Sequence, residues 1–69
     1  MKMIPVVSSN IKCIGYDEKT KALRIQFRNG TYEYSNVPKD VYDELMDSES
    51  IGAYATAHIV KGGYQYKKV

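Results

Sequence analysis

Cysteine and histidine are nearly absent from this chain of 69 residues, which carries one of each, Cys13 and His58. A single cysteine excludes an intramolecular disulfide, and these two residues cannot fill the tetrahedral shell of a structural zinc site. Because a lone thiol suits a reducing compartment, we expect a cytoplasmic protein. No apolar run approaches the roughly 20 residues of a membrane-spanning helix, and the first residues lack the apolar core of a signal peptide. We therefore expect no membrane contact.

Catalytic and metal-binding patterns are missing as well. A general base needs a positioned nucleophile or a substrate pocket, and a chain of this length offers neither to His58. No cation or helix N-terminus that would activate the thiol is expected beside Cys13. The carboxylates of residues 40–49 lack the alternating spacing and final glutamate of a calcium loop. We expect a protein that is not an enzyme and that has neither a cofactor nor a metal site.

The charges are distributed unevenly although the formal net charge is only +2. Residues 38–50 carry one lysine against five acidic residues, a local balance of −4, so the remainder of the chain carries +6. Such a dipolar molecule could attract phosphate to its basic side while its acidic side repels it. Ordinary solvated charges on a small domain explain the same pattern, and this alternative stays open.

The strongest structural signal is the dipeptide Asn29-Gly30 between two alternating runs of apolar and polar residues. This pair is typical of a two-residue β-hairpin turn in which both residues have positive φ. A turn at these positions also sets which residues face each other across the hairpin. The predicted pairs are Arg28 with Thr31, Phe27 with Tyr32, Gln26 with Glu33, Ile25 with Tyr34, and Arg24 with Ser35.

Side-chain alternation gives this hairpin one buried face and one solvated face. The pair Tyr32 and Tyr34 shares its face with the most apolar triplet of the chain. We therefore interpret both tyrosines as core rings whose hydroxyls reach the rim, in preference to a platform for stacking bases. The buried face comprises Leu23, Ile25, Phe27, Tyr32 and Tyr34, and the solvated face comprises Arg24, Gln26, Arg28, Glu33 and Ser35.

A first strand precedes the hairpin. It spans residues 11–17, and the short polar loop after it turns the chain so that Tyr16 lies opposite Leu23. Gly15 indicates a bulge or a tight contact within this strand. Residues 1–8 form a loose or edge-lying lead-in. Together with the hairpin, these elements predict a three-stranded antiparallel meander.

Two helices follow the predicted sheet. Apolar residues recur at helical spacing after Pro38, which is well placed at the start of a helix, and again between residues 51 and 60. The pair Gly62-Gly63 ends the second helix. Because residues 64–69 alternate apolar and polar side chains, they form either a short fourth strand or an ordered tail. The sequence therefore predicts an α+β fold in which two C-terminal helices pack on one face of the meander.

Several short segments occur in a characteristic order from Ser8 to Tyr66. They are Ser8-Ser9-Asn10-Ile11, Ile14-Gly15-Tyr16-Asp17, Leu23-x-Ile25-x-Phe27, Gly30-x-Tyr32-x-Tyr34, Val37-Pro38, Tyr42, Leu45 and Ser50-x-Gly52-x-Tyr54. This order resembles the KTSC family, a domain of about this length whose central motif is Tyr-x-Tyr. The chain departs from the family at Ala55, where a large aromatic residue is expected, and this departure implies a locally smaller core or a rearranged second helix.

The resemblance implies a single KTSC-like domain over residues 1–69. The family occurs alone in bacterial and phage proteins and at the C-terminus of some lysyl-tRNA synthetases, and it has no established activity. RNA binding has been proposed for it because of the synthetase attachment. The resemblance therefore implies RNA as a partner, by analogy with the family rather than from any residue of this chain.

Two segments carry candidate contacts to nucleic acid. Arg24 and Arg28 lie on the solvated face of one predicted strand, where their guanidiniums could grip backbone phosphates, unless Glu33 pairs with one of them. The segment Tyr64-Gln65-Tyr66-Lys67-Lys68 interleaves aromatic and basic side chains, a pattern that suits single-stranded nucleic acid. In the alternative interpretation, its tyrosines pack on the second helix and its lysines protect an edge strand from further pairing.

The residues favour a non-catalytic module that binds nucleic acid, and the resemblance to the KTSC family implies RNA in preference to DNA. Phosphate contacts are predicted at Arg24, Arg28, Lys67 and Lys68, with stacking on Tyr64 or Tyr66. The alternative is a protein-interaction module, such as a phage or mobile-element protein that docks on a larger partner through its acidic helix or an open sheet edge. The small size and the open edges are also compatible with a homodimer.

Overall fold

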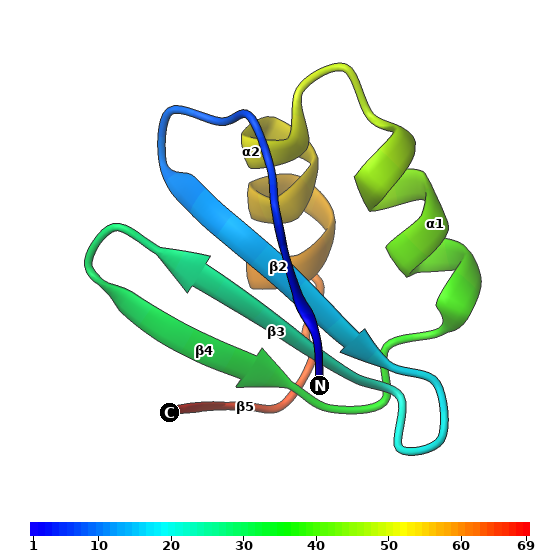
Figure 1. Ribbon diagram of the computed structural model, residues 1–69. Helices are drawn as coiled ribbons and strands as arrows, with labels where there is room; N and C mark the ends of the chain where they lie inside the picture. Colours follow the sequence, from blue (N-terminus) through cyan, green and yellow to red (C-terminus); the bar gives the residue numbers. More distant parts are fainter.

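Alternating apolar residues in the first half of the chain build the centre of an antiparallel sheet. The computed structural model describes residues 1–69 and shows a five-stranded sheet in the order β1-β2-β3-β4-β5 with helices on one face (Figure 1). The class is the predicted α+β, but the sheet has more strands than the three or four expected. The elements are β1 (Met3–Pro5), β2 (Ile11–Asp17), β3 (Ala22–Phe27), β4 (Gly30–Tyr34), α1 (Lys39–Asp47), α2 (Ile51–Tyr54), the π-helical segment η1 (Ala55–Val60) and β5 (Tyr66–Lys68).

The additional strand lies in the predicted lead-in. β1 pairs antiparallel with β2, and Ile4 lies opposite Ile14. This short strand contains Pro5, which lowers the strand signal in the sequence but is tolerated here because β1 is an edge strand. Of the two predicted alternatives, a loose or an edge-lying segment, residues 3–5 take the edge position, and the expectation of a loose segment is corrected for them.

The first hairpin has the predicted register. Tyr16 lies opposite Leu23, and the shift in pairing falls between Ile11 and Cys13. Gly15 is the tight contact rather than the bulge, because a Cβ atom on it would lie 2.5 Å from the Sδ atom of Met3 on the neighbouring strand. The same Cβ atom would lie 3.0 Å from the backbone oxygen of Lys2, so the close approach of the N-terminal segment favours glycine at this position.

The second hairpin differs from the predicted register by two residues. Tyr32 lies opposite Ile25 and Gly30 lies opposite Phe27, so Arg28 and Asn29 form the turn. Gly30 has a φ of 149°, whereas Asn29 is not among the residues of positive φ, so the expected turn type is wrong. Because side chains alternate with a period of two, an even shift leaves every residue that lies within β3 or β4 on its predicted face, whereas Arg28 moves from the strand into the turn.

Contacts outside the hairpin account for this shift. The backbone N–H of Arg28 donates to the carbonyl oxygen of Asn10 at 3.2 Å, and its side-chain Nε donates to the carbonyl oxygen of Ser9 at 2.6 Å. Both acceptors belong to the loop before β2. These bonds hold Arg28 in the turn, and a rule based on the turn sequence alone does not include them.

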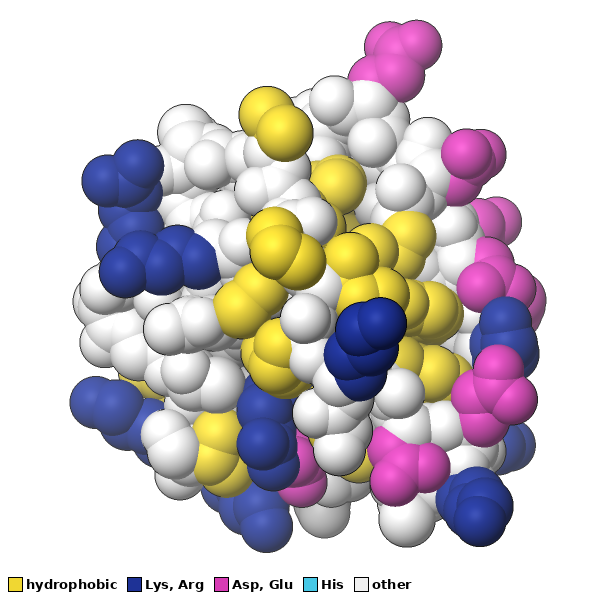
Figure 2. Space-filling model, in the orientation of Figure 1, with side chains coloured by type: hydrophobic (Ala, Val, Ile, Leu, Met, Phe, Trp, Pro, Cys, Tyr) yellow, Lys and Arg dark blue, Asp and Glu magenta, His cyan; other side chains and the backbone are white.

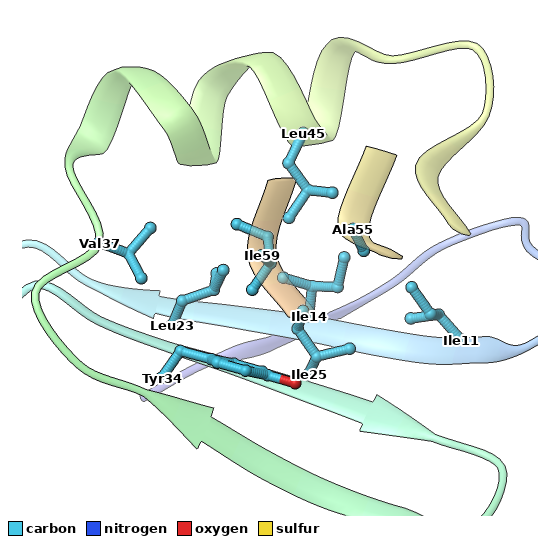
Figure 3. Packing of buried hydrophobic residues seen from close by; sticks show 9 residues of the cluster. All are labelled: Ile11, Ile14, Leu23, Ile25, Tyr34, Val37, Leu45, Ala55 and Ile59. Atoms are coloured by element: carbon cyan, nitrogen blue, oxygen red, sulfur yellow. The ribbon is translucent and has the colours of Figure 1, made fainter. Parts of the chain in front are cut away.

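The core lies between the sheet and the helices. Leu45 of α1 and Ala55 and Ile59 of the second helix pack against side chains of the three central strands (Figure 3). The second helix changes from α- to π-helical winding at Ala55, the position where the chain departs from the KTSC pattern. The buried residues are Ile11, Ile14, Leu23, Ile25, Tyr34, Val37, Leu45, Ala55 and Ile59.

The C-terminal segment forms the second sheet edge. After Gly63, which has a φ of 83°, the chain leaves the helix layer and β5 pairs with β4. Tyr66 lies opposite Tyr34, Lys67 opposite Glu33, and Lys68 opposite Tyr32. Of the two predicted alternatives, residues 66–68 take the strand.

Candidate nucleic-acid interface

One carboxylate dominates the solvated face of the sheet. Glu33 accepts hydrogen bonds from Arg24, with Oε1 at 2.6 Å from Nη2 and 3.2 Å from Nε. The ammonium of Lys67 lies 3.8 Å from the other Glu33 oxygen, and the Glu33 side chain is only 17% exposed. Two predicted phosphate contacts therefore share a partly buried anion. An incoming phosphate must compete with Glu33 for them.

Arg28 does not join Arg24 on the strand. It lies in the turn between β3 and β4, is exposed, and is tied through Nε to the carbonyl oxygen of Ser9. The structure thus separates the two arginines that the sequence analysis placed on one strand face. Arg24 belongs to the ion-pair cluster, and Arg28 belongs to the turn.

Tyr64 lies on the other side of the molecule from this cluster. It packs against the core and lines a cleft of about 550 Å³ between α1 and the second helix, together with Glu44, Asp47, Tyr54 and other side chains. The phenol of Tyr54 donates to Glu44 at 2.7 Å, and this hydrogen bond raises the pKa of Tyr54 to about 12. Because the carboxylates of this cleft would repel phosphate, Tyr64 is poorly placed to stack a base of a nucleic-acid strand.

A second cavity lies on the helix-side face at the outer strands. Its volume is about 330 Å³, and most of its lining is aromatic. The second helix ends at Val60, which is 47% exposed, so the helix layer does not cover this end of the sheet. Figure 1 shows β4 and β5 on the side of the sheet away from α1. We call this cavity the aromatic pocket; it is lined by Phe27, Asn29, Tyr32, Tyr34, Val60 and Tyr66.

The rings of the aromatic pocket contact one another. Tyr32 makes edge contacts with Phe27 and with Tyr66, each at a centroid separation of 6.0 Å, and Tyr34 lies 5.6 Å from Tyr66. Tyr34 is buried, Tyr32 is half-buried, and Tyr66 is 62% exposed. Tyr34 and Tyr32 therefore form the packed floor of the pocket, and the exposed ring of Tyr66 forms one of its walls.

Lys68 lies beside the aromatic pocket, whereas Lys67 lies on the opposite face. Lys68 pairs across from Tyr32, and its Cε atom comes within 3.1 Å of the place where a Cβ atom on Gly30 would stand. Lys68 takes part in none of the ion pairs of the molecule. The structure thus places Tyr66 and Lys68 on the same face of the sheet, and it places Arg24 and Lys67 on the other face, where both pair with Glu33.

Sequence reasoning missed the aromatic pocket as a cavity. Alternation correctly placed Phe27 on the same face as Tyr32, and this was the available signal. It could not show that the helix layer stops at Val60, because that depends on how the second helix lies on the sheet. Asn29 enters the pocket lining only because the turn is shifted by two residues.

The charges are separated over the surface. Figure 2 shows the acidic side chains gathered along the side of the molecule where α1 lies, and basic side chains along the opposite and lower sides. This agrees with the local balance of −4 over residues 38–50. The only lysine of α1, Lys39, is bound to Asp43 and Glu18, and its pKa is raised, chiefly by the hydrogen bond with Asp43. None of the helices has the length and apolar character needed to cross a membrane.

Comparisons with known proteins agree with this architecture. The chain is 43% identical over 60 residues to a protein from Tsukamurella paurometabola, covering 86% of this chain and 88% of that protein. It is 36% identical over 62 residues to a lysine–tRNA ligase from Nostoc punctiforme, covering 88% of this chain but only 11% of the ligase. The crystal structure of a KTSC domain protein from Yersinia pestis is similar over 99% of this chain and 96% of that chain, with a TM-score of 0.92 and 38% identity. The family model of the KTSC domain matches residues 7–64, and the chain therefore belongs to the KTSC domain family.

Proposed function

We propose that this protein is a non-catalytic module that binds single-stranded RNA in the cytoplasm along strand β5. The observation that carries this proposal is Tyr66, an aromatic ring exposed on an edge strand and followed by two lysines. Because side chains alternate along β5, Lys67 and Lys68 lie on opposite faces of the edge. A strand that crosses the edge could stack a base on Tyr66 and place phosphates near both ammonium groups.

The charge separation and the relatives support the same proposal. Most acidic side chains lie along the α1 side of the molecule, so at the β5 edge a polyanion meets chiefly Glu33, which is already paired with Arg24 and Lys67. One of the similar proteins is named as a lysine–tRNA ligase, and the match covers 88% of this chain. A region similar to this chain thus forms part of a lysine–tRNA ligase.

Fluorescence anisotropy with a labelled ten-nucleotide RNA at low salt tests the proposal. We expect weak binding by the wild type, a loss of binding for the double variant Lys67→Ala with Lys68→Ala, and a marked loss for Tyr66→Ala. The matched control is Lys2→Ala with Lys19→Ala, which removes the same charge away from the β5 edge. Absence of binding by the wild type at low salt would show that the proposal is wrong.

Two further comparisons complete this experiment. Arg24→Ala with Arg28→Ala measures the part of the binding that comes from the two arginines, which we expect to be smaller because Glu33 already occupies Arg24 and Ser9 holds Arg28. A DNA strand of the same sequence tests the preference for RNA. Equal affinity for both strands would contradict the RNA preference while leaving single-strand binding intact.

The acidic cleft favours a second candidate function, docking of a basic segment of a protein partner. Glu44 accepts a hydrogen bond from Tyr54, and neither Glu44 nor Asp47 has a cationic partner in the molecule. Carboxylates beside the rings of Tyr54 and Tyr64 suit an arginine or lysine side chain. Backbone amide shifts during titration with an arginine-rich peptide would map to this cleft, and Asp47→Asn would weaken the response. Sedimentation equilibrium tests the homodimer separately.

A further inference from the structure

We propose that the aromatic pocket holds one unpaired nucleobase, which accepts a hydrogen bond from the phenol of Tyr34 while a neighbouring phosphate contacts Lys68. This inference rests on the proposed function and deepens it, because it assigns the base to a defined cavity. Stacking on an exposed ring needs no cavity, whereas a base held in the pocket requires the floor residues as well. The two ideas therefore make different predictions for the same strand.

Tyr34 is the observation that points to a ligand. The phenols of Tyr16 and Tyr54 donate to a carbonyl oxygen at 2.6 Å and to a carboxylate at 2.7 Å, whereas the other five of the seven tyrosines have no hydrogen-bond partner in the protein, and Tyr34 is the only buried one among them. The residue is only 4% exposed, yet its oxygen is not among the sealed polar atoms, so that oxygen keeps some access to solvent. The aromatic pocket is the cavity that Tyr34 lines. A phenol that donates to no protein atom and keeps access to solvent has its hydrogen free for an acceptor on a ligand in this pocket.

The Tyr34 phenol is available as a hydrogen-bond donor. Figure 3 shows the ring lying along the sheet toward Ile25, with its oxygen at the end remote from the backbone of β4. Burial, followed by the neighbouring Tyr66 and Tyr32, raises the pKa of the Tyr34 phenol. The group is therefore protonated at neutral pH and can donate to a carbonyl oxygen or ring nitrogen of a base.

The size and lining of the pocket suit a single base. Its volume of about 330 Å³ lies at the lower end of the range of ligand sites, roughly 300–1,000 Å³. Phe27, Tyr32 and Tyr66 provide aromatic surface for stacking, and Asn29 at the turn offers an amide that can both donate and accept. The walls thus recognise an aromatic ring with polar edges, which is the chemistry of a nucleobase.

Lys68 supplies the contact to the sugar–phosphate backbone. Its ammonium lies 3.6 Å from the position of a Cβ atom on Gly30, next to the ring of Tyr32. Any side chain at Gly30 would crowd Lys68 and would also be strained by the φ of 149°. Glycine at this position therefore leaves room for the end of the Lys68 side chain, whose ammonium would contact a phosphate next to the bound base.

The test compares a ten-nucleotide uridine strand with an abasic ribose-phosphate strand of the same length and charge, using the full-length protein. We expect the abasic strand to bind more weakly to the wild type. Tyr34→Phe should weaken binding of the uridine strand by about three- to ten-fold, the loss of one neutral hydrogen bond, and leave the abasic strand unchanged. Tyr42→Phe is the matched control, because it removes a phenol from the opposite side of the core, where Tyr42 stacks on Tyr16 at 4.7 Å.

The outcomes separate the inference from the proposed function. No binding of either strand at low salt overturns both. Equal binding of the two strands, or binding of the uridine strand that is unaffected by Tyr34→Phe, overturns the pocket and leaves electrostatic RNA binding standing. Asn29→Ala provides a second variant in an exposed turn that does not disturb the core, and we expect it to weaken the uridine strand alone. Circular dichroism verifies that each variant is folded.

Discussion

At the scale of single residues, Glu33 controls the charge of the solvated sheet face. It is shared by Arg24 and Lys67, so the face carries two cations but much less free positive charge than the sequence suggests. We expect Glu33→Gln to tighten RNA binding by about two- to five-fold at low salt, because it releases Arg24 and Lys67 from their ion pairs with this partly buried carboxylate. Fluorescence anisotropy measures the change.

Asp47→Asn is the control for this prediction, since it removes the same charge from the acidic cleft. If the two variants tighten binding equally, the effect comes from net charge and the local role of Glu33 is contradicted. The comparison also reports on the path of the strand. If only Glu33→Gln increases the affinity for RNA, at least one phosphate of the bound strand lies on the solvated face.

Tyr54 gives a prediction in the alkaline range. Its pKa is raised from 10.0 to about 12 by donation to Glu44, so the folded state retains this proton more strongly than the unfolded chain. The stabilisation is complete below pH 10 and is lost as the pH rises toward 12, because only the unfolded state releases the proton in that window. We expect Tyr54→Phe to lower the free energy of unfolding by about 0.5–1.5 kcal/mol at pH 8, and by less at pH 11.

Urea denaturation at the two pH values measures this difference, and absorbance at 295 nm follows ionisation of the phenols. A gap between wild type and variant that is the same at pH 8 and pH 11 would contradict the bond between Tyr54 and Glu44. Glu44→Gln offers a parallel check. It keeps a hydrogen-bond acceptor but removes the charge, so we expect the Tyr54 titration to move back toward its ordinary range.

At the scale of elements, the pair Gly62-Gly63 directs the chain from the helix layer to β5. A Cβ atom on Gly63 meets nothing within 4 Å, but its φ of 83° is unfavourable for other residues. We expect Gly63→Ala to destabilise the protein by about 1–2 kcal/mol through backbone strain alone, and Gly63→Asn to cost less because asparagine tolerates this conformation. Chemical denaturation of both variants tests the order.

Gly62→Ala acts through a different mechanism. Its Cβ atom would collide with the carbonyl oxygen of His58, a backbone atom that cannot turn away as a side chain can. We expect a larger loss of stability than for Gly63→Ala, and an accompanying loss of RNA binding because β5 is displaced. If both alanine variants were as stable as the wild type, Gly62 and Gly63 would not be required for the path of the chain from the second helix to β5.

The hairpin shows which features of an element can be predicted from the sequence. Alternation identified both strands and both faces, since it depends only on neighbouring residues. The register was wrong by two because Arg28 bonds to Ser9, 19 residues away, and to Asn10. The sequence analysis did not count β1 as a strand, because a segment of three residues that includes a proline has a weak strand signal of its own. It forms an edge strand through its pairing with β2, a contact that the local sequence does not show.

At the scale of the whole molecule, charge separation predicts how RNA binding depends on salt. For single strands, log K falls with log salt concentration by about 0.7 for each phosphate contact. We expect the slope to shrink by about 1.4 in the variant Lys67→Ala with Lys68→Ala, provided the wild type binds through both lysines. Anisotropy titrations at a series of salt concentrations measure the slope.

The control variant Lys2→Ala with Lys19→Ala should alter the slope far less, because neither lysine lies on the β5 edge. A slope that falls equally in both variants indicates diffuse attraction to the net charge of +2 and contradicts a defined path along β5. This measurement is independent of the aromatic pocket. It therefore distinguishes the electrostatic part of the proposal from the part carried by Tyr66 and Tyr34.

The amino-acid sequence by itself determined the α+β class, the central strands with their buried and solvated faces, and the helices in the second half of the chain. These features follow from the periodicity of apolar residues, which is a local property. The order of short motifs also gave the resemblance to the KTSC family. The sequence also identified Tyr66 and Lys68 as candidates. Only the tertiary structure decided the sheet edges, the hairpin register, the sharing of Glu33 and the end of the helix layer at Val60. Each of these depends on contacts between segments distant in the chain, and the aromatic pocket exists because such contacts leave one end of the sheet uncovered.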